Sequence, residues 1–264
     1  MWLLSNKVLV RESGLMEGFR DCHCHLLPGV DDGVQEISET MQILQEWELL
    51  GVQEVWLTPH IMEDYPNEPE ELRRVFNDNL NPDDSRVVGK HFSIRLHLAA
   101  EHMMDGLFLR RLEYGGVMPY VENIDLNDNL NEKENGYGYH ESKKLLVETS
   151  YYTPPMNMAD VIERVKARDY EPILAHPERY QYIDRRDYRH WKERGVLFQL
   201  NVPSLVGAYG PEVQQKAEWL LKEGMYDHCG TDTHSIEQMN YFLSSEISKK
   251  TVKRVKRIAE NQEL

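Results

Sequence analysis

The chain has 264 residues, which is long enough for one large domain with a sizeable core, and its formal net charge is −15. Its acidic character excludes broad binding to nucleic acid or to anionic lipid, because both attract basic surfaces. No run approaches the ~18 consecutive apolar residues of a membrane span, and the opening apolar run, MWLL, is too short for the core of a signal peptide.

The cysteine content indicates a reducing compartment. The chain has three cysteines, an odd number, and their spacing is not that of a disulfide framework. We therefore predict a soluble cytoplasmic protein that neither inserts into a membrane nor binds nucleic acid.

Short apolar runs alternate with amphipathic runs along the chain. The amphipathic runs predict helices over residues 36–50, 68–80, 106–113, 157–168, 184–194 and 211–222, and Asn157 is expected to cap the fourth of these. The apolar runs predict seven strands, over residues 19–26, 52–60, 93–102, 143–151, 171–180, 196–204 and 225–235. This alternation predicts an α/β fold with a mostly parallel sheet, open or closed into a barrel.

Two stretches do not follow this rhythm. Residues 1–17 precede the first strand and are expected to form an N-terminal arm. Residues 117–142 are rich in asparagine, glycine and charge, so they cannot bury much apolar area, and we predict a long surface loop. The remainder, residues 18–264, is expected to be a single domain.

Polar side chains of a particular kind follow the predicted strands. The carboxyl ends of parallel strands meet at one rim, so side chains placed there should converge on one pocket. Every strand except the sixth ends in, or is followed by, histidine, aspartate or glutamate. The residues in question are His23, His25, Asp31, Asp32, His60, Glu101, Glu148, His176, Asp232 and His234.

The chemistry of this set is that of a metal site. Imidazole and carboxylate together suit divalent manganese, iron or zinc, and there are too many groups for one ion. Two or three ions that share bridging carboxylates would use them all. Any one of these histidines alone is more simply explained as a core or capping residue. The repetition over six strands instead favours a multinuclear site.

The two cysteines between the histidines are expected to be ordinary core residues. Side chains two apart on a strand point the same way, so His23 and His25 share one face while Cys22 and Cys24 share the other. Cys229 is likewise out of phase with Asp232, and a C-x-C spacing is unusual for zinc thiolate sites. Six further histidines show no placement at a strand end: His91, His97, His102, His140, His190 and His228.

The order of several motifs resembles that of a known family. The motifs HxH, PGVDDG, TPH, AAEH, LVETSY, AHPERY, LNVPSLVGAYG and GTDTHS, in this order, are similar to those of the polymerase-and-histidinol-phosphatase (PHP) superfamily. More narrowly, they resemble bacterial metal-dependent tyrosine-protein phosphatases of capsule and exopolysaccharide gene clusters. The likeness covers about residues 19–235. It implies a distorted seven-stranded (β/α) barrel of PHP type, with the metal site at the carboxyl ends of the strands.

The resemblance also implies roles for individual residues. It implies three divalent ions, commonly manganese with iron or zinc as alternatives, and it selects Asp32 over Asp31. Arg179 of HPERY takes the place of the family's phosphate-binding arginine, and Asp32 and Arg179 are the expected catalytic residues. The family's second arginine, a few residues after the last histidine, has no counterpart in SIEQMNYF. The implied metal ligands are His23, His25, Asp32, His60, Glu101, Glu148, His176, Asp232 and His234.

The expected activity is hydrolysis of a phosphomonoester, with a protein phosphotyrosine as the substrate. The phenol of tyrosine has a pKa of ~10, so it leaves without strong acid assistance. The expected partner is a bacterial tyrosine kinase of capsule or exopolysaccharide synthesis, through its phosphorylated tail. Three alternatives remain: a histidinol-phosphate phosphatase, a metal-bound regulatory module without turnover, and a proofreading nuclease, which fits an acidic chain poorly.

Overall fold

The computed structural model describes residues 6–80, 92–121 and 143–264. Most of the loop predicted over 117–142, and the first residues of the predicted N-terminal arm, lie outside the described residues. Within the described parts, no helix combines the length and the apolar character that crossing a lipid bilayer requires.

The centre of the fold consists of parallel strands in two sheets. One sheet has the order β10-β9-β8-β7-β6-β4, and the other has the order β2-β3-β5. The strands are β2 (Arg20–Cys24), β3 (Glu54–Leu57), β4 (His60–Ile61), β5 (Arg95–Leu98), β6 (Glu101–Met103), β7 (Lys143–Glu148), β8 (Tyr170–Ala175), β9 (Leu197–Asn201) and β10 (His228–Gly230).

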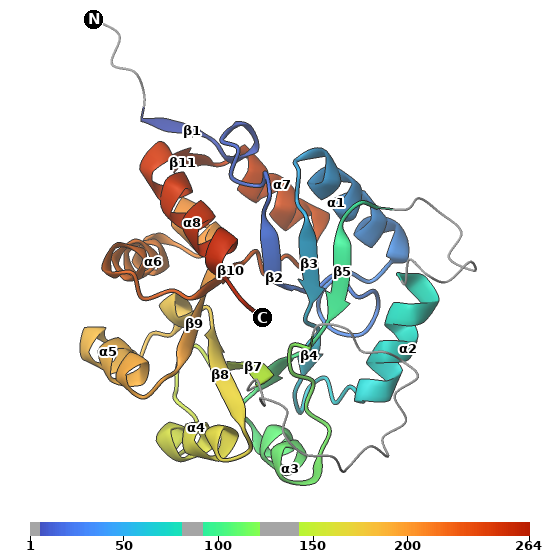
Figure 1. The fold of residues 1–264 in the computed structure, drawn as a ribbon, viewed down its shortest axis with the longest axis vertical. Helices are drawn as coiled ribbons and strands as arrows, with labels where there is room; N and C mark the ends of the chain where they lie inside the picture. The colour runs from blue at the N-terminus through green and yellow to red at the C-terminus, as the bar shows by residue number, and fades with distance from the viewer. Residues whose placement is uncertain (1–5, 81–91, 122–142) are drawn as a thin grey trace, which may run out of the picture.

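Helices surround these strands (Figure 1). The chain passes from strand to helix to strand, as parallel pairing requires. Three short 3₁₀ helices interrupt the connections, η1 (Val10–Glu12), η2 (Pro177–Arg179) and η3 (Val202–Val206). The helices are α1 (Ile37–Leu49), α2 (Pro69–Asn79), α3 (Gly106–Tyr114), α4 (Met158–Lys166), α5 (Arg185–Glu193), α6 (Pro211–Glu223), α7 (Ile236–Ser244) and α8 (Lys249–Asn261).

The strands are apolar on both faces because both faces are buried. On β7, Leu145 and Val147 belong to the large cluster that the helices cover. Leu146, between them, belongs to a small second cluster with Trp56 and Ile173, on the face away from the helices. This alternation explains why the strands read as short, nearly continuous apolar runs.

The chain ends are tied to the same core. Strand β1 (Lys7–Leu9) pairs antiparallel with β11 (Glu246–Ser248), and Val10, Leu15 and Met16 are buried among the core side chains. After α8, the Gln262 side chain accepts from the Cys229 amide and donates to the Arg20 carbonyl. The C-terminal segment therefore lies against the amino ends of β2 and β10.

The α/β class and the parallel sheet are confirmed, whereas closure into one seven-stranded barrel is not. Two predicted strands are each interrupted, which gives β3 and β4 in place of 52–60 and β5 and β6 in place of 93–102. The predicted cap of the fourth helix is only half right. Asn157 occupies the capping position, but in a left-handed conformation, and its side chain makes no capping hydrogen bond.

Candidate metal centre

The structure gathers the predicted strand-end residues at the carboxyl ends of the strands. Ligand-type atoms there fall into three groups, within each of which all atoms lie within 4.8 Å of one another. The groups share members, as a multinuclear centre requires. They are His25 with Asp32, His60 and His234; His23 with His25 and Glu101; and His60 with Glu101 and Glu148.

Glu101 is shared by two of the three groups. Its Oε2 atom lies 3.2 Å from His23 Nε2, 3.3 Å from His25 Nε2 and 3.3 Å from His60 Nδ1. Its Oε1 atom lies 2.9 Å from His176 Nε2. The side chain is fully buried. One carboxylate therefore faces four imidazoles, which is the arrangement of a bridging ligand.

The histidines of the first strand face each other across a very short gap. His23 Nε2 and His25 Nε2 are 3.1 Å apart. Both also lie 3.5 Å from Asp232 Oδ1. The opposite edge of each ring is held, since His23 Nδ1 lies 3.0 Å from Gln199 Oε1 and His25 Nδ1 lies 2.8 Å from Asp31 Oδ2. Both Nε2 atoms are thereby turned toward the same space.

Two glycines allow this close packing. A Cβ atom on Gly33 would lie 2.2 Å from the His25 carbonyl oxygen, and one on Gly230 would lie 2.7 Å from His23 Cβ. Neither position can carry a side chain without displacing a histidine. This explains why the second glycine position of PGVDDG, Gly33, and the glycine position of GTDTHS, Gly230, carry no side chain.

The neighbouring aspartates in PGVDDG have different surroundings. Asp31 is buried, and its carboxylate accepts hydrogen bonds from the amides of His60 and Gly33 besides its contact with His25. Burial raises the pKa of Asp31, but His25 and these hydrogen bonds outweigh it and hold the pKa below its ordinary value. Asp32 is half exposed, 3.5 Å from His60 Nε2 and 3.7 Å from His234 Nε2.

Two of the expected ligands stand on left-handed backbone. His176 has φ 32° and Asp232 has φ 52°, and neither is a glycine. Each follows directly, or within two residues, the end of a strand, β8 or β10. Left-handed backbone at such residues costs free energy and is concentrated at functional sites, so this strain is consistent with a site at the rim.

Arg179 is held rigidly beside these groups. Its guanidinium lies between two tyrosine rings, 4.3 Å from the centroid of Tyr151 and 4.2 Å from that of Tyr209. One nitrogen donates to Asp232 Oδ2 over 2.8 Å. The motif around it is fixed by Glu178, which is buried and accepts from the Asn201 amide. Burial lowers the pKa of Arg179, but Asp232 and the tyrosines raise it, so this cation is permanent.

Strand β9, the sixth of the predicted strands, contributes side-chain amides where the other predicted strands contribute histidine or carboxylate side chains. The buried Gln199 contacts His23 and accepts from the His176 amide over 3.1 Å. Asn201 donates to Asp232 Oδ2 over 2.9 Å and to the Tyr209 hydroxyl over 3.1 Å. These side chains orient the rim residues through hydrogen bonds, as residues that contact metal ligands without binding the metal commonly do.

The pKa values of the histidines in the cluster are shifted in opposite directions by their neighbours. Burial lowers the pKa of His23, but Glu101 and Asp232 outweigh it and raise the pKa to about 9. Burial and the neighbouring His25 together lower the pKa of His234 to about 4. The cluster thus attracts protons at one histidine and excludes them at another. Metal cations would satisfy the carboxylates without requiring every imidazole to be protonated.

The buried atoms also fit a metal. Glu101 Oε2 accepts no hydrogen bond within the described residues although three imidazole nitrogens surround it. His60 Nδ1 and His176 Nδ1 are likewise buried without a hydrogen bond there. Buried polar atoms normally have partners, and a bound cation would provide one.

The other sequence candidates lie elsewhere. Cys22, Cys24 and Cys229 are buried free thiols, and no candidate ligand group among the described residues includes them. His102 is a core residue that contacts the Leu146 carbonyl and accepts from the Met118 amide. Three further histidines of the described residues belong to none of the candidate ligand groups, His97, His190 and His228. The last two, His91 and His140, are not among the residues that the structure describes.

The rim residues open into a cavity of about 260 Å³, which we call the rim pocket. Sequence reasoning missed two tyrosines that line this pocket and two amide side chains that support the rim residues from outside it. Tyr151 and Tyr209 stand inside recognised motifs, but nothing in their spacing pointed to Arg179. Gln199 and Asn201 were overlooked because amides are not typical metal ligands. The pocket is lined by Asp32, His60, Glu101, Tyr151, His176, Arg179, Tyr209, Asp232, His234 and Gln238.

The chain is similar to known bacterial proteins over most of its length. The family model of capsular polysaccharide synthesis proteins, CpsB/CapC, matches residues 19–257. The tyrosine-protein phosphatase YwqE of Bacillus subtilis is 25% identical over 84% of this chain and 79% of its own length. The putative tyrosine-protein phosphatase CapC of Staphylococcus aureus is 22% identical over 84% of this chain and 80% of its own.

A solved structure shares the fold. It comes from the crystallographic work on YwqE from Bacillus subtilis and CpsB from Streptococcus pneumoniae, described as unique metal-dependent tyrosine phosphatases. The match has a TM-score of 0.68 at 20% identity and covers 92% of this chain and 95% of the other.

Proposed function

The chain belongs to the CpsB/CapC family of capsular polysaccharide synthesis, and on this premise we propose that it is a metal-dependent phosphatase of protein phosphotyrosine. One observation carries the proposal. A rigid arginine, Arg179, faces the same pocket as a converging set of imidazoles and carboxylates. Relatives named tyrosine-protein phosphatases support this substrate over histidinol phosphate.

The proposed cofactor is a set of three divalent ions, with manganese as the first choice. Three overlapping groups of ligand atoms and the orphaned oxygen of Glu101 support this number. When bound, such ions supply an activated water and a counter-charge for phosphoryl oxygens. The proposed ligands are His23, His25, Asp32, His60, Glu101, Glu148, His176, Asp232 and His234.

Arg179 is proposed to hold the phosphoryl group. Its planar fork can donate to two phosphoryl oxygens, and the flanking rings of Tyr151 and Tyr209 restrict its movement. Such a preorganised donor stabilises the charge that develops in the transition state. Asp32, half exposed in the same pocket, is the second proposed catalytic residue.

Tyrosine suits this site as a leaving group. Its phenol has a pKa of ~10, so departure needs no strong general acid. The proposed substrate protein is a bacterial tyrosine kinase of capsule or exopolysaccharide synthesis, dephosphorylated on its tail. The three buried free thiols support an expectation that the protein works in a reducing compartment such as the cytoplasm.

We also propose that the two parallel sheets form one distorted seven-stranded barrel, if β3 with β4 and β5 with β6 count as single interrupted strands. Backbone hydrogen bonds support closure at the joins. The Ala99 amide donates to the Leu57 carbonyl, and the Glu101 amide to the Pro59 carbonyl. On the other side, the Asp232 amide donates to the His23 carbonyl over 2.7 Å.

Phosphate release from a panel of substrates tests the proposed function. The protein, supplied with Mn²⁺, is given a phosphotyrosine peptide, the matching phosphoserine peptide and histidinol phosphate. We expect turnover of the phosphotyrosine peptide well above both of the others. Preference for histidinol phosphate would reassign the substrate, and metal binding without any turnover would support a regulatory module instead.

A further inference from the structure

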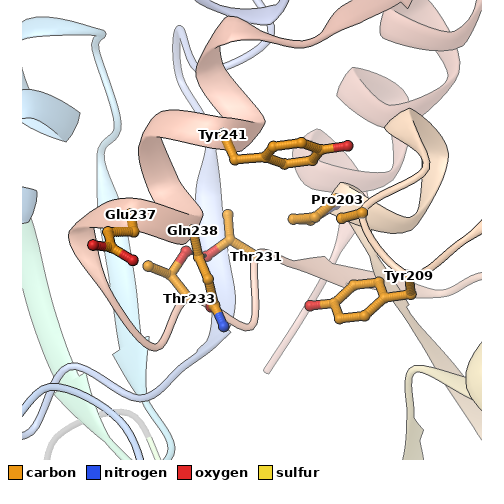
Figure 2. Close-up of a pocket in the computed structure, with 8 residues that line it drawn as sticks. Pro203, Tyr209, Thr231, Thr233, Glu237, Gln238 and Tyr241 are labelled. Atoms are coloured by element: carbon orange, nitrogen blue, oxygen red, sulfur yellow. Dashed lines mark hydrogen bonds between the residues drawn. The ribbon is translucent and has the colours of Figure 1, made fainter.

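A second cavity of about 300 Å³ adjoins the rim pocket. It lies between α7 and the segment that follows β9. Figure 2 shows the ring of Tyr241 reaching from α7 toward Pro203, with Tyr209 across the opening from Gln238. We call this cavity the side pocket. It is lined by Pro203, Ala208, Tyr209, Thr231, Thr233, Glu237, Gln238 and Tyr241.

The side pocket and the rim pocket share a wall. Tyr209 and Gln238 line both cavities. Both are tied to residues of the metal centre, because the Tyr209 ring packs on Arg179 and the Gln238 side-chain oxygen accepts from the His234 amide over 2.9 Å. The side pocket therefore lies next to the place where a substrate would be held at Arg179.

The lining of the side pocket is suited to an uncharged, apolar group. Pro203, Ala208 and the ring of Tyr241 present carbon surface, and Tyr241 is 52% exposed. None of the described residues that line it is a lysine or an arginine, and Glu237 adds a negative charge to the lining. An acidic group would be repelled there, whereas an apolar side chain would be removed from water.

We infer that the side pocket holds an apolar side chain of the substrate protein, next to the phosphotyrosine in its sequence. This inference rests on the proposed function. The rim pocket already offers the rings of Tyr151 and Tyr209 to the phosphorylated phenyl group. The adjoining side pocket is then available to the residues of the substrate protein that flank the phosphotyrosine. The side pocket thereby becomes the determinant of sequence preference in an enzyme whose phosphate contacts are the same for every phosphotyrosine.

A set of matched phosphotyrosine peptides tests this inference. The peptides differ only in having leucine, serine or aspartate at one of the two positions on either side of the phosphotyrosine, and p-nitrophenyl phosphate serves as a substrate without a peptide. At one position we expect leucine to give kcat/KM about 10-fold above serine, the usual scale for one apolar contact in a pocket. Aspartate there should fall below serine.

Two variants connect this preference to the side pocket. Tyr241→Ala removes a wall and Ala208→Trp fills the space. Each should reduce the leucine-to-serine ratio toward 1, together with the ratio of leucine-peptide to p-nitrophenyl phosphate turnover. Tyr114→Ala is the matched control, since Tyr114 is an exposed tyrosine at the end of α3. It should keep both ratios.

The outcomes separate this inference from the proposed function. If neither the peptides nor p-nitrophenyl phosphate is hydrolysed by the metal-loaded protein, the proposed function itself fails. If all are hydrolysed with no preference for leucine at any position, the inference is overturned. Equal losses on the leucine peptide and on p-nitrophenyl phosphate in Ala208→Trp would also overturn it, because the side pocket would then hold the phenyl ring.

Discussion

Two buried glutamates of this chain have opposite surroundings. Glu54, at the amino end of β3, accepts hydrogen bonds from Arg20, Arg95 and the Trp56 indole. Glu101, at the carboxyl rim, is surrounded by imidazoles, and its Oε2 atom accepts no hydrogen bond within the described residues. Both carboxylates are almost completely buried, so burial alone does not distinguish them.

The difference lies in the counter-charge. Burial raises the pKa of Glu54, but hydrogen bonds from two arginines outweigh it and lower the pKa to about 2. Those arginines are charged at every physiological pH. Glu101 depends on histidines, which are charged only when protonated. Glu54 thus has permanent charged partners, whereas Glu101 has none among the described residues around it and leaves a place for a cation.

Neutralising Glu101 is the strongest way to test this contrast. Glu101→Gln keeps the shape of the side chain but removes the charge that two of the three groups of ligand atoms share. We expect the variant to lose bound metal and to reduce phosphotyrosine turnover to background, because an amide is a poor bridging ligand. Metal analysis and a turnover assay on the same sample check this. Full metal content in the variant would show that Glu101 is not a bridging ligand.

Arg179→Ala should have the next largest effect. We expect kcat/KM to fall on the order of 10²-fold while the metals and the fold remain, which is the usual scale for one charge-stabilising donor. Arg179→Lys should recover only part of the loss, because an ammonium lacks the planar fork. Arg185→Ala is the matched control, since Arg185 also packs over an aromatic ring, that of Trp219, outside the rim pocket. Loss of metal in Arg179→Ala would assign the arginine a structural role instead.

Glu54→Gln should separate stability from activity. The substitution leaves two arginines without their carboxylate, and we expect the free energy of unfolding to fall by about 1–3 kcal/mol. Metal content and phosphotyrosine turnover of the folded variant should stay at the level of the unmodified chain. Denaturant unfolding combined with metal analysis measures both. A loss of metal in a folded variant would mean that the two ends of the strands are coupled.

Cys24→Ser should have the smallest effect. The cysteine thiol donates to the Trp56 carbonyl over 3.4 Å, and a serine hydroxyl can make the same contact, so we expect a loss of only about 1 kcal/mol. Metal content should not change. If the folded variant lost a metal equivalent, the assignment of this thiol to the core rather than to the metal centre would be wrong.

The sequence predicted the positions of the rim residues better than their supports. Strand ends can be located from local apolar runs, and strand alternation orients His23 and His25. The interruption between β3 and β4 was missed because only two residues, Thr58 and Pro59, separate Leu57 from His60. The pairing of β1 with β11 joins segments about 240 residues apart, and no local pattern encodes such a register.

The residues around Arg179 were unpredictable for a different reason. Tyr151 and Tyr209 follow different strands, and their rings meet the guanidinium only because of how those connections turn. The row of Arg20, Glu54 and Arg95 is likewise a product of strand register, since these residues are direct neighbours across β2, β3 and β5. Charge rows of this kind require the pairing to be known first.

Metal content and turnover, followed together through removal and reloading, test the central claim most directly. The protein is stripped with a chelator, and Mn²⁺ is returned in steps while bound metal and phosphotyrosine turnover are measured. We predict that turnover falls to background when the centre is empty and returns as bound metal rises, whereas Glu101→Gln does not recover. Full turnover of the stripped protein, with metal analysis showing an empty centre, would contradict the account.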